Sequence, residues 1–393
     1  MKKVLYFFPD NIGIQNSGNK TRAIHLLKYL ANKGYDVDFV SLKHEKEDID
    51  SEQATVDYIS FNKLASKVYL LPRKPGKKNL IAYFFKYKLR DLLYYLFSFP
   101  LKSNIPTFIT VKLKEAFEAI LRKKSFDYII ISYVFYADLV ANTKLLGNAK
   151  LIIDTHDFIT GQFKDKRNFN LGVTFADEIN RLNAFHEIWA ISTEERYIYN
   201  QFCKPTVRLV TMMMDKPVAL DIPVNRKKYH LIYVASNNIH NIKSAAWFFD
   251  KVYPLLPKYI SICVIGKINN HIVDDYAIHR VLHAPSLDEY YSDAEVAICP
   301  MLSGTGVKVK VVEALSYGLP VVCNESGTDG LPNKIDNGCL VSNNPARYAQ
   351  LIMQLLNDPQ FYQQQSELAK SFFQKSFETS TVLQVLDQAF GTN

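Results

Sequence analysis

The stretch PMLSGTGVKVKVVEALSYGLPVV, from Pro300 to Val322, decides the fold. It predicts a strand that ends near residue 300, a glycine loop, a helix, a Gly-Leu-Pro turn and another strand. Gly304 and Gly306 allow backbone N–H groups and the positive end of the helix to approach an anion. Lys310 and Glu313 are three residues apart, so they share a helical face. A cation beside a diphosphate and a carboxylate that accepts from a ribose are what a nucleotide diphosphate requires.

The same alternation of apolar strands and helix-length segments extends through the chain in both directions. Strands are predicted at 4–8, 37–42, 128–131, 151–154 and 188–191, then at 231–234, 261–266, 295–299 and 319–323. Helices are predicted at 21–33, around 245–252 and from 345 to 390, and the pattern breaks near residues 215–228. Apolar strands separated by helices are typical of parallel sheets covered on both faces. We therefore expect two Rossmann-like α/β domains, 1–215 and 216–376.

Composition limits the class of protein. The 393 residues are 22% charged and 48% hydrophobic, which favours a globular chain over a disordered or fibrous one. Five cysteines, none in a C-x-x-C pair, support neither a disulfide framework nor a zinc site. The apolar run at the start is short for a signal peptide, and no stretch reaches the length of a membrane span. We expect a cytoplasmic protein.

Charge is concentrated in one segment. Residues 67–124 hold 14 Lys and Arg against 3 acids, whereas the whole chain has a net charge of +8. The densest aromatic run, 83–99, lies inside this segment. Cations and aromatic residues at near-helical spacing favour a helix at an anionic membrane surface. The alternative, held with equal weight, is that the aromatic residues pack a core and the lysines are solvated. Nucleic acid is the least favoured partner, and we expect none.

The stretch from Glu295 to Leu331 closely resembles the donor-binding signature of retaining glycosyltransferases of the GT-B fold, the family 4 type. The signature runs G-x-G-x-x-x-K-x-x-E-A, then G-x-P-V-V, then G-x-x-G-L, and the last part is matched by residues 327–331. The resemblance extends less sharply over most of the chain. It implies that the second domain binds a nucleotide sugar and that the first binds the acceptor. It also implies that the last helix, within 377–393, returns to the first domain.

The resemblance assigns roles in the second domain. Glu313 would hold the ribose hydroxyls, and Lys310 would face the diphosphate and the charge on the leaving group. The amides around Gly304, Thr305 and Gly306 would lie near the sugar or its phosphates. Thr305 is a departure, because many members have a glutamate there that touches the donor sugar. The donor sugar therefore cannot be identified from the residue at this position.

Residues in the first domain also fit the resemblance. Gly18 and Asn19 follow the first strand and open a helix, where they would lie against the donor phosphate; by themselves they indicate an ordinary turn and cap. The segment D-T-H-D, residues 154–157, follows a strand, and its His156 would lie beside the donor sugar at the reacting carbon. The alternative for His156 is a histidine satisfied within a loop. A Ser-His-Asp hydrolase is excluded, because the chain lacks a G-x-S-x-G elbow.

Phosphate binding departs from the family pattern in the second domain. Many relatives have an Arg and Lys pair after its first strand, where this chain has Ser236 or Asn237 and then Asn241. Lys310 would then neutralise most of the phosphate charge, with help from Lys308 or Arg22. Lys308 is two residues from Lys310, so on a helix it would point away into solvent. Base recognition is expected from the backbone near residues 282–285, which include His283.

The implied reaction is transfer of a hexose with retention of configuration, from a UDP-sugar or, as second choice, a GDP-sugar. The acceptor class we favour is a hydroxyl of a glycan or lipid-linked acceptor in bacterial surface polysaccharide synthesis, at the inner face of the membrane. We expect no metal and no other cofactor, because the D-x-D strings at 36–38 and 48–50 do not follow strands. Two alternatives stay open. One is a nucleotide-sugar 2-epimerase of the same fold, for which Asp154 and Asp157 are the few candidate carboxylates. The other is a non-catalytic partner subunit.

Overall fold

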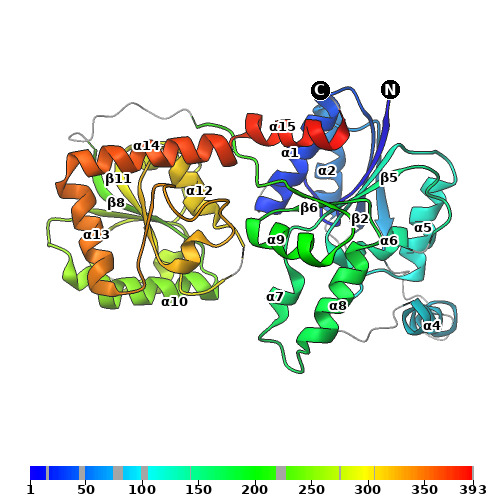
Figure 1. The fold of residues 1–393 in the computed structure, drawn as a ribbon, viewed down its shortest axis with the longest axis horizontal. Helices are drawn as coiled ribbons and strands as arrows, with labels where there is room; N and C mark the ends of the chain where they lie inside the picture. Colours follow the sequence, from blue (N-terminus) through cyan, green and yellow to red (C-terminus); the bar gives the residue numbers. More distant parts are fainter. Residues whose placement is uncertain are drawn as a thin grey trace. The chain divides into compact units, whose positions relative to one another are not determined.

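The computed structural model describes residues 1–14, 17–43, 49–73, 83–98, 105–141, 143–217, 227–273, 276–304 and 306–391. The chain divides into two compact units, Met1–Val210 and Thr211–Asn393. Figure 1 shows a twisted sheet flanked by helices in each of them. The expected domain limits, with 377–393 returning to the first domain, stay a prediction.

The first unit is built on one sheet of seven parallel strands in the order β3-β2-β1-β4-β5-β6-β7. The strands are β1 (Lys3–Phe7), β2 (Asp36–Lys43), β3 (Lys67–Pro72), β4 (Tyr128–Ser132), β5 (Lys150–Asp154), β6 (Glu187–Ala190) and β7 (Thr206–Leu209). The order reverses direction between β1 and β4, which places the loops after these two strands at the switch point of a doubly wound sheet.

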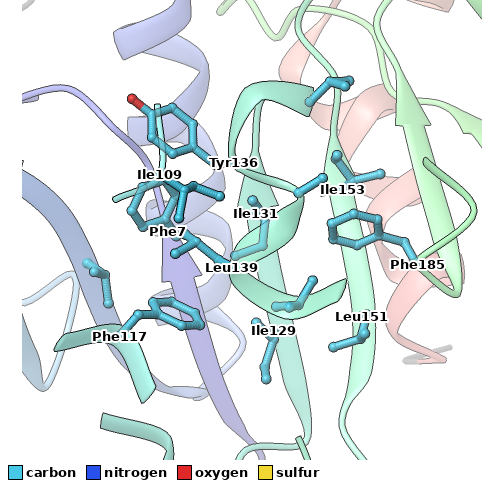
Figure 2. Close-up of a cluster of buried hydrophobic side chains, with 14 of the residues drawn as sticks. Phe7, Ile109, Phe117, Ile129, Ile131, Tyr136, Leu139, Leu151, Ile153 and Phe185 are labelled. Carbon is cyan, nitrogen blue, oxygen red and sulfur yellow. The ribbon is translucent and has the colours of Figure 1, made fainter. Parts of the chain in front are cut away.

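Helices connect these strands and cover the sheet. They are α1 (Gly18–Asn32), α2 (Ile49–Phe61), the π-helical turn η1 (Phe84–Lys88), α4 (Leu89–Ser98), α5 (Val111–Leu121), the 3₁₀ turn η2 (Val134–Tyr136), α6 (Asp138–Ala141), α7 (Ile159–Phe163), α8 (Leu171–Leu182) and α9 (Thr193–Phe202). Figure 2 shows one face of the sheet, where Ile129, Ile131 and Ile153 pack with Phe7 and Phe185. Because strand residues alternate between faces, these buried apolar runs fix the register of the sheet.

The second unit repeats the plan with six parallel strands in the order β10-β9-β8-β11-β12-β13. They are β8 (Tyr229–Val234), β9 (Ile262–Ile265), β10 (His279–Val281), β11 (Ala294–Cys299), β12 (Val321–Cys323) and β13 (Cys339–Val341). This is the Rossmann order, with its switch point between β8 and β11. Leu231 and Tyr233 belong to the core on one face, and Ile232 belongs to the core on the other, as the two-residue period of a strand requires.

The helices of the second unit follow the same alternation. They are α10 (Ile239–Trp247), the π-helical turn η4 (Phe248–Val252), the 3₁₀ turns η5 (Tyr253–Leu255) and η6 (Lys267–His271), α11 (Asp288–Ser292), α12 (Val309–Ser316), the 3₁₀ turn η7 (Glu325–Thr328), α13 (Pro345–Asn357), α14 (Pro359–Ser376) and α15 (Thr379–Phe390). The helix expected around 245–252 therefore begins earlier, at Ile239, where Asn238 caps it by accepting from the backbone N–H of Asn241.

Two further findings concern the helices and the cysteines. None of the helices within the described ranges is long and apolar enough to cross a membrane. The five cysteines are all free thiols, and three of them are buried in the strands of the second sheet. These three buried cysteines serve as small apolar residues of the core.

Candidate functional site

Except for His283, the residues expected at the site lie beyond the carboxyl ends of strands at or next to each switch point. In the first unit these are the segments after β1, β4 and β5, and in the second unit the segments after β8 and β11. Loops at this edge of a doubly wound sheet are where ligands bind. The two groups are the first-unit cluster (Asn19, Arg22, Tyr133, Asp154 and His156) and the second-unit cluster (Asn241, Lys308, Lys310 and Glu313).

The first-unit cluster centres on a buried carboxylate. Asp154 ends β5 and is 1% exposed. Its two oxygens accept from Arg22, at 2.7 Å from Nη2 and at 3.0 and 3.1 Å from Nε. Nε2 of His156 lies 3.1 Å from Oδ2 of the same carboxylate. Burial alone would raise the pKa of Asp154, but Arg22 and His156 outweigh it and hold the pKa well below its usual range. The carboxylate therefore stays charged and holds both neighbours.

Arg22 has a different role from the one expected. Sequence reasoning made it a helper for a phosphate, but its side chain is 3% exposed and its guanidinium is engaged by Asp154. A buried guanidinium with a bidentate carboxylate partner anchors α1 to β5, because neither charge can be left unpaired in the interior. The structure thus makes Arg22 a positioning residue for the strand end that carries His156.

Tyr133, which sequence reasoning did not select, completes the first-unit cluster. Its ring stacks on that of His156, with 4.3 Å between centroids and 14° between planes. Its hydroxyl accepts a hydrogen bond of 2.9 Å from Nδ2 of Asn19, which lies in the first turn of α1. Gly18 begins that helix, as expected from the sequence. The signal that could have identified Tyr133 is its position directly after β4, at the switch point.

Buried glutamates hold the backbone that follows His156. Glu178 accepts from the N–H groups of Ile159 and Thr160 at 3.0 and 2.8 Å, at the start of α7. Glu195 accepts from Oγ1 of Thr155 at 3.1 Å, and burial raises its pKa to about 8. Asp157, which lies between Thr155 and Ile159 in the sequence, is partly buried, and burial raises the pKa of its carboxyl to about 6. The segment 154–160 is therefore held at several points.

The second-unit cluster is arranged around the glycine loop. Gly304 has φ of 112° and Gly306 has φ of 73°, conformations that side chains with a Cβ rarely adopt. The loop leads directly into α12, whose first turns carry Lys310 and Glu313. Nζ of Lys310 donates to Oδ1 of Asn241 at 2.8 Å, and it lies 5.5 Å from the ring centroid of Tyr233. The amide of Asn241 is itself oriented, since its Nδ2 donates to the backbone oxygen of Ser236 at 3.0 Å.

Lys308 corrects an expectation. It was expected to point into solvent from a helix, but it precedes α12 as its N-cap residue, with extended backbone, and its side chain is 7% exposed. Its ammonium group donates to the backbone oxygens of Gly306 and Gly304 at 2.7 and 3.3 Å, and lies 4.0 Å from Oδ2 of Asp329. Lys308 therefore ties the glycine loop to the segment 327–331, the G-x-x-G-L part of the signature.

Glu313 lies on α12 among tyrosines. The hydroxyl of Tyr291 is 3.4 Å from Oε2 of Glu313, and burial raises the pKa of this carboxyl above its ordinary value. The ring of Tyr291 stacks on that of Tyr317, with 4.9 Å between centroids, and the hydroxyl of Tyr317 donates to Asp288. The side chain of Glu313 is half-buried, and its carboxyl lies within reach of the Tyr291 hydroxyl.

The remaining predicted residues are not drawn into this group. Asn237 and His283 are exposed, in the loops after β8 and β10, and Asn241 makes the contact to Lys310 in place of Asn237. Thr305 lies outside the described residues. Within the described ranges, no group of three His, Cys, Asp or Glu side chains could hold a metal ion. Metal independence stays a prediction.

Comparison with known proteins agrees with this geometry. Residues 228–358 match the sequence profile of a family described as Glycosyl transferases group 1. Over 97% of the chain, the sequence is 21% identical to a Klebsiella pneumoniae protein described as an uncharacterized 44.6 kDa protein in the cps region, of which 98% is covered. The matched range contains the whole second-unit cluster.

Solved structures share the fold over essentially the full chain. Sucrose-phosphate synthase of Thermosynechococcus elongatus superimposes with a TM-score of 0.69 at 14% identity, covering 100% of both chains. HepE of Anabaena, in complex with UDP-glucose, gives 0.66 at 12% identity and 100% of both chains. A TarM variant of S. aureus, in complex with UDP and other ligands, gives 0.66 at 14% identity, covering 99% of this chain and 100% of its own.

These findings establish the fold. The chain has the GT-B fold, with two Rossmann-like units of parallel sheets, and the resemblance to glycosyltransferases of this fold is confirmed. The match to the Glycosyl transferases group 1 profile falls within the second unit.

Proposed function

We propose that this protein transfers a hexose from a nucleotide diphosphate sugar, a UDP-sugar before a GDP-sugar, to a hydroxyl of a glycan or lipid-linked acceptor in bacterial surface polysaccharide synthesis. The observation that carries the proposal is the second-unit cluster. Lys310 and Glu313 project from the first turns of α12, directly after a glycine loop at the switch point of a Rossmann sheet. The UDP-glucose bound by HepE and the UDP bound by TarM favour a uridine nucleotide here.

Lys310 and Glu313 of the second-unit cluster each have a matching partner on such a donor. The ammonium group of Lys310 neutralises the diphosphate, and the N–H groups at the start of α12 add donors to the same anion. Glu313 accepts from the ribose hydroxyls, and its charged form is the stronger acceptor. In this scheme the diphosphate is handled by Lys310 and backbone amides, without a metal ion.

The first-unit cluster serves the sugar and the acceptor. His156 is oriented by Asp154 on one side and by the stacked ring of Tyr133 on the other. In the reaction, the bond between the anomeric carbon and the diphosphate oxygen breaks while the acceptor oxygen bonds to that carbon from the same face. The acceptor proton passes to the departing phosphate oxygen, so configuration is retained without a carboxylate nucleophile. The charge that develops on the diphosphate is what Lys310 stabilises.

The test is calorimetric titration with UDP, GDP and CMP without metal, followed by turnover assays. We expect saturable binding of one diphosphate, weakened about tenfold to a hundredfold in Glu313→Ala, because a hydrogen bond to a charged group contributes about 1.5–3 kcal/mol. Lys310→Met should lower turnover by about a hundredfold or more. Lys258→Met, an exposed lysine of the same unit, is the matched control and should change neither quantity.

Three results would contradict the proposal. Binding of no nucleotide would favour a non-catalytic partner subunit. An epimerised sugar formed without acceptor would favour a 2-epimerase, in which Asp157 would be the carboxyl to replace first. Turnover in Lys310→Met equal to that of the Lys258→Met control would exclude Lys310 from the chemistry.

A further inference from the structure

The segment 83–98 carries an apolar face that the described residues of the first unit leave exposed. It consists of the π-helical turn η1 followed without interruption by α4, and Figure 1 shows α4 at the margin of its unit, outside the helices that flank the sheet. Four large apolar side chains on it are exposed by between 36% and 62%: Phe85, Leu89, Leu92 and Leu96. Their spacing of four, three and four residues places them in one stripe along the helix.

Two more residues widen the stripe. Phe84 and Leu93 are 49% and 44% exposed and adjoin it in the sequence. Other exposed apolar residues of the same unit, such as Phe61 and Leu171, belong to separate helices, α2 and α8. Single exposed apolar residues are ordinary on protein surfaces, whereas six on sixteen consecutive residues mark an interaction surface.

The opposite face of α4 is tied to the body of the unit. Oδ1 of Asp91 accepts from the backbone N–H of Val111 at 2.8 Å, at the start of α5. The hydroxyl of Tyr94 accepts from Nζ of Lys114 at 3.1 Å. On a helical projection, Asp91 and Tyr94 lie on the side away from the stripe. These contacts hold α4 in place, and the apolar stripe faces outward for that reason.

The basic side chains around the stripe indicate what kind of surface would cover it. Residues 67–124 carry 14 basic groups against 3 acids. Within the helix itself, Lys88 is exposed beside the stripe, and Arg90 is exposed towards α5, where it pairs with Glu115 at 2.6 Å. An apolar stripe bordered by cations fits a surface that is apolar inside and anionic outside, which is the boundary of a bilayer with anionic lipids. A nucleic acid offers no apolar layer for the stripe.

We propose that residues 83–98 dock the first unit onto an anionic lipid surface, with α4 lying in the plane of the interface and the stripe of Phe85, Leu89, Leu92 and Leu96 inserted among the acyl chains. α4 has ten residues, too few to span a bilayer, so the contact is peripheral. The inference goes beyond the proposed function and does not depend on it, because it concerns where the protein binds and not which reaction it performs.

The test is flotation of the full-length protein with lipid vesicles. Vesicles of phosphatidylcholine with about 30% phosphatidylglycerol should carry the protein, and vesicles of phosphatidylcholine alone should carry several-fold less. Raising the salt to about 0.5 M should weaken the binding, because the Debye length then falls well below 10 Å. The double variant Leu92→Glu with Leu96→Glu should lose at least tenfold in bound fraction, since it places two anions within the stripe.

A matched double variant serves as control. Phe61→Glu with Leu171→Glu makes the same change of charge at two exposed apolar positions of the same unit, which are 86% and 63% exposed. It should float as the unsubstituted protein does, and thermal unfolding should show all three proteins equally folded.

Equal binding by both double variants, or no binding to anionic vesicles at all, would overturn the proposal. So would a dimer in light scattering that Leu92→Glu with Leu96→Glu abolishes, because the stripe would then be an interface between copies. Nucleotide binding, measured in parallel, separates this outcome from a failure of the proposed function.

Discussion

Tyr133 and His156 stack almost parallel, with ring centroids 4.3 Å apart, and both have positive φ, 69° and 62°. Such conformations are uncommon for residues with a Cβ and carry a local energetic cost of about 1–3 kcal/mol each. The surrounding contacts hold both rings against that cost. Asp154 fixes His156, and Asn19 donates to the hydroxyl of Tyr133. The pair is therefore oriented before any ligand arrives.

Removing the ring of Tyr133 should cost activity more than removing its hydroxyl. We expect Tyr133→Ala to lower kcat by about 10- to 100-fold, because a displaced reacting group costs that much. Tyr133→Phe keeps the stack and should lose no more than a few-fold. Steady-state kinetics with separate kcat and KM for the donor, beside a thermal unfolding curve, measure this. Equal kcat in the two variants would show that the stack does not position His156.

The buried pair of Arg22 and Asp154 should behave differently from a surface pair. Arg22→Leu leaves the buried carboxylate of Asp154 without its guanidinium partner and should lower the free energy of unfolding by about 3–5 kcal/mol. Adding Asp154→Leu should recover much of this loss, because the unpaired charge is gone. Urea unfolding measures all three values. Arg122→Leu, which breaks the exposed pair with Glu118, is the control and should cost about 0.5 kcal/mol or less. A double variant no more stable than Arg22→Leu would contradict the expectation.

Lys308 should affect donor binding through the loop that it holds. Lys308→Met removes the donor to the backbone oxygens of Gly304 and Gly306, so the loop must order itself when ligand binds. We expect the affinity for the diphosphate to fall by about tenfold, with a smaller change in kcat, and Lys308→Arg to restore part of it. Calorimetry and kinetics together give the two values. Unchanged affinity in Lys308→Met would mean that the loop keeps its shape without this contact.

Glu195 should make stability depend on pH. Its pKa is about 8 in the folded protein, against an ordinary value of 4.5. The unfolded chain therefore releases this proton first, and the free energy of unfolding falls as pH rises from about 4.5 to about 8. Each unit of pKa difference corresponds to about 1.4 kcal/mol.

Glu195→Gln removes the titration while keeping an oxygen that accepts from Thr155. Its stability should exceed that of the unsubstituted protein at pH 8.5 by more than at pH 5, as urea unfolding at both values would show. A constant difference between the two proteins at both pH values would contradict the prediction.

The sequence predicts the parts of this molecule that depend on local patterns. Strands expected at 4–8 and 151–154 are found at Lys3–Phe7 and Lys150–Asp154, because continuous apolar runs between helices have few other solutions. The edge strand Lys67–Pro72 was missed, since its residues were considered only as part of a basic segment. Contacts between side chains that are far apart in the sequence were harder to predict than this strand.

Lys308 and Tyr133 show why distant partners escape prediction. The helical period places Lys308 in solvent only if the helix has already begun, but α12 begins at Val309, and the backbone of Lys308 is extended. Tyr133 meets Asn19 across 114 residues, a contact that no local pattern contains. Glu313 and Lys310, by contrast, could be paired on one helical face from their spacing alone, because both lie within α12.

The hydrogen bond from Lys310 to Asn241 has a consequence for selectivity. Asn241 takes one of the three N–H donors of the ammonium group, so the group is held in place while a ligand can bind through the others. An anion gains most from those donors, since a charged acceptor binds an ammonium group more strongly than a neutral one does. An uncharged sugar gains less. Under the proposed function, charge at Lys310 therefore favours a diphosphate over a free sugar.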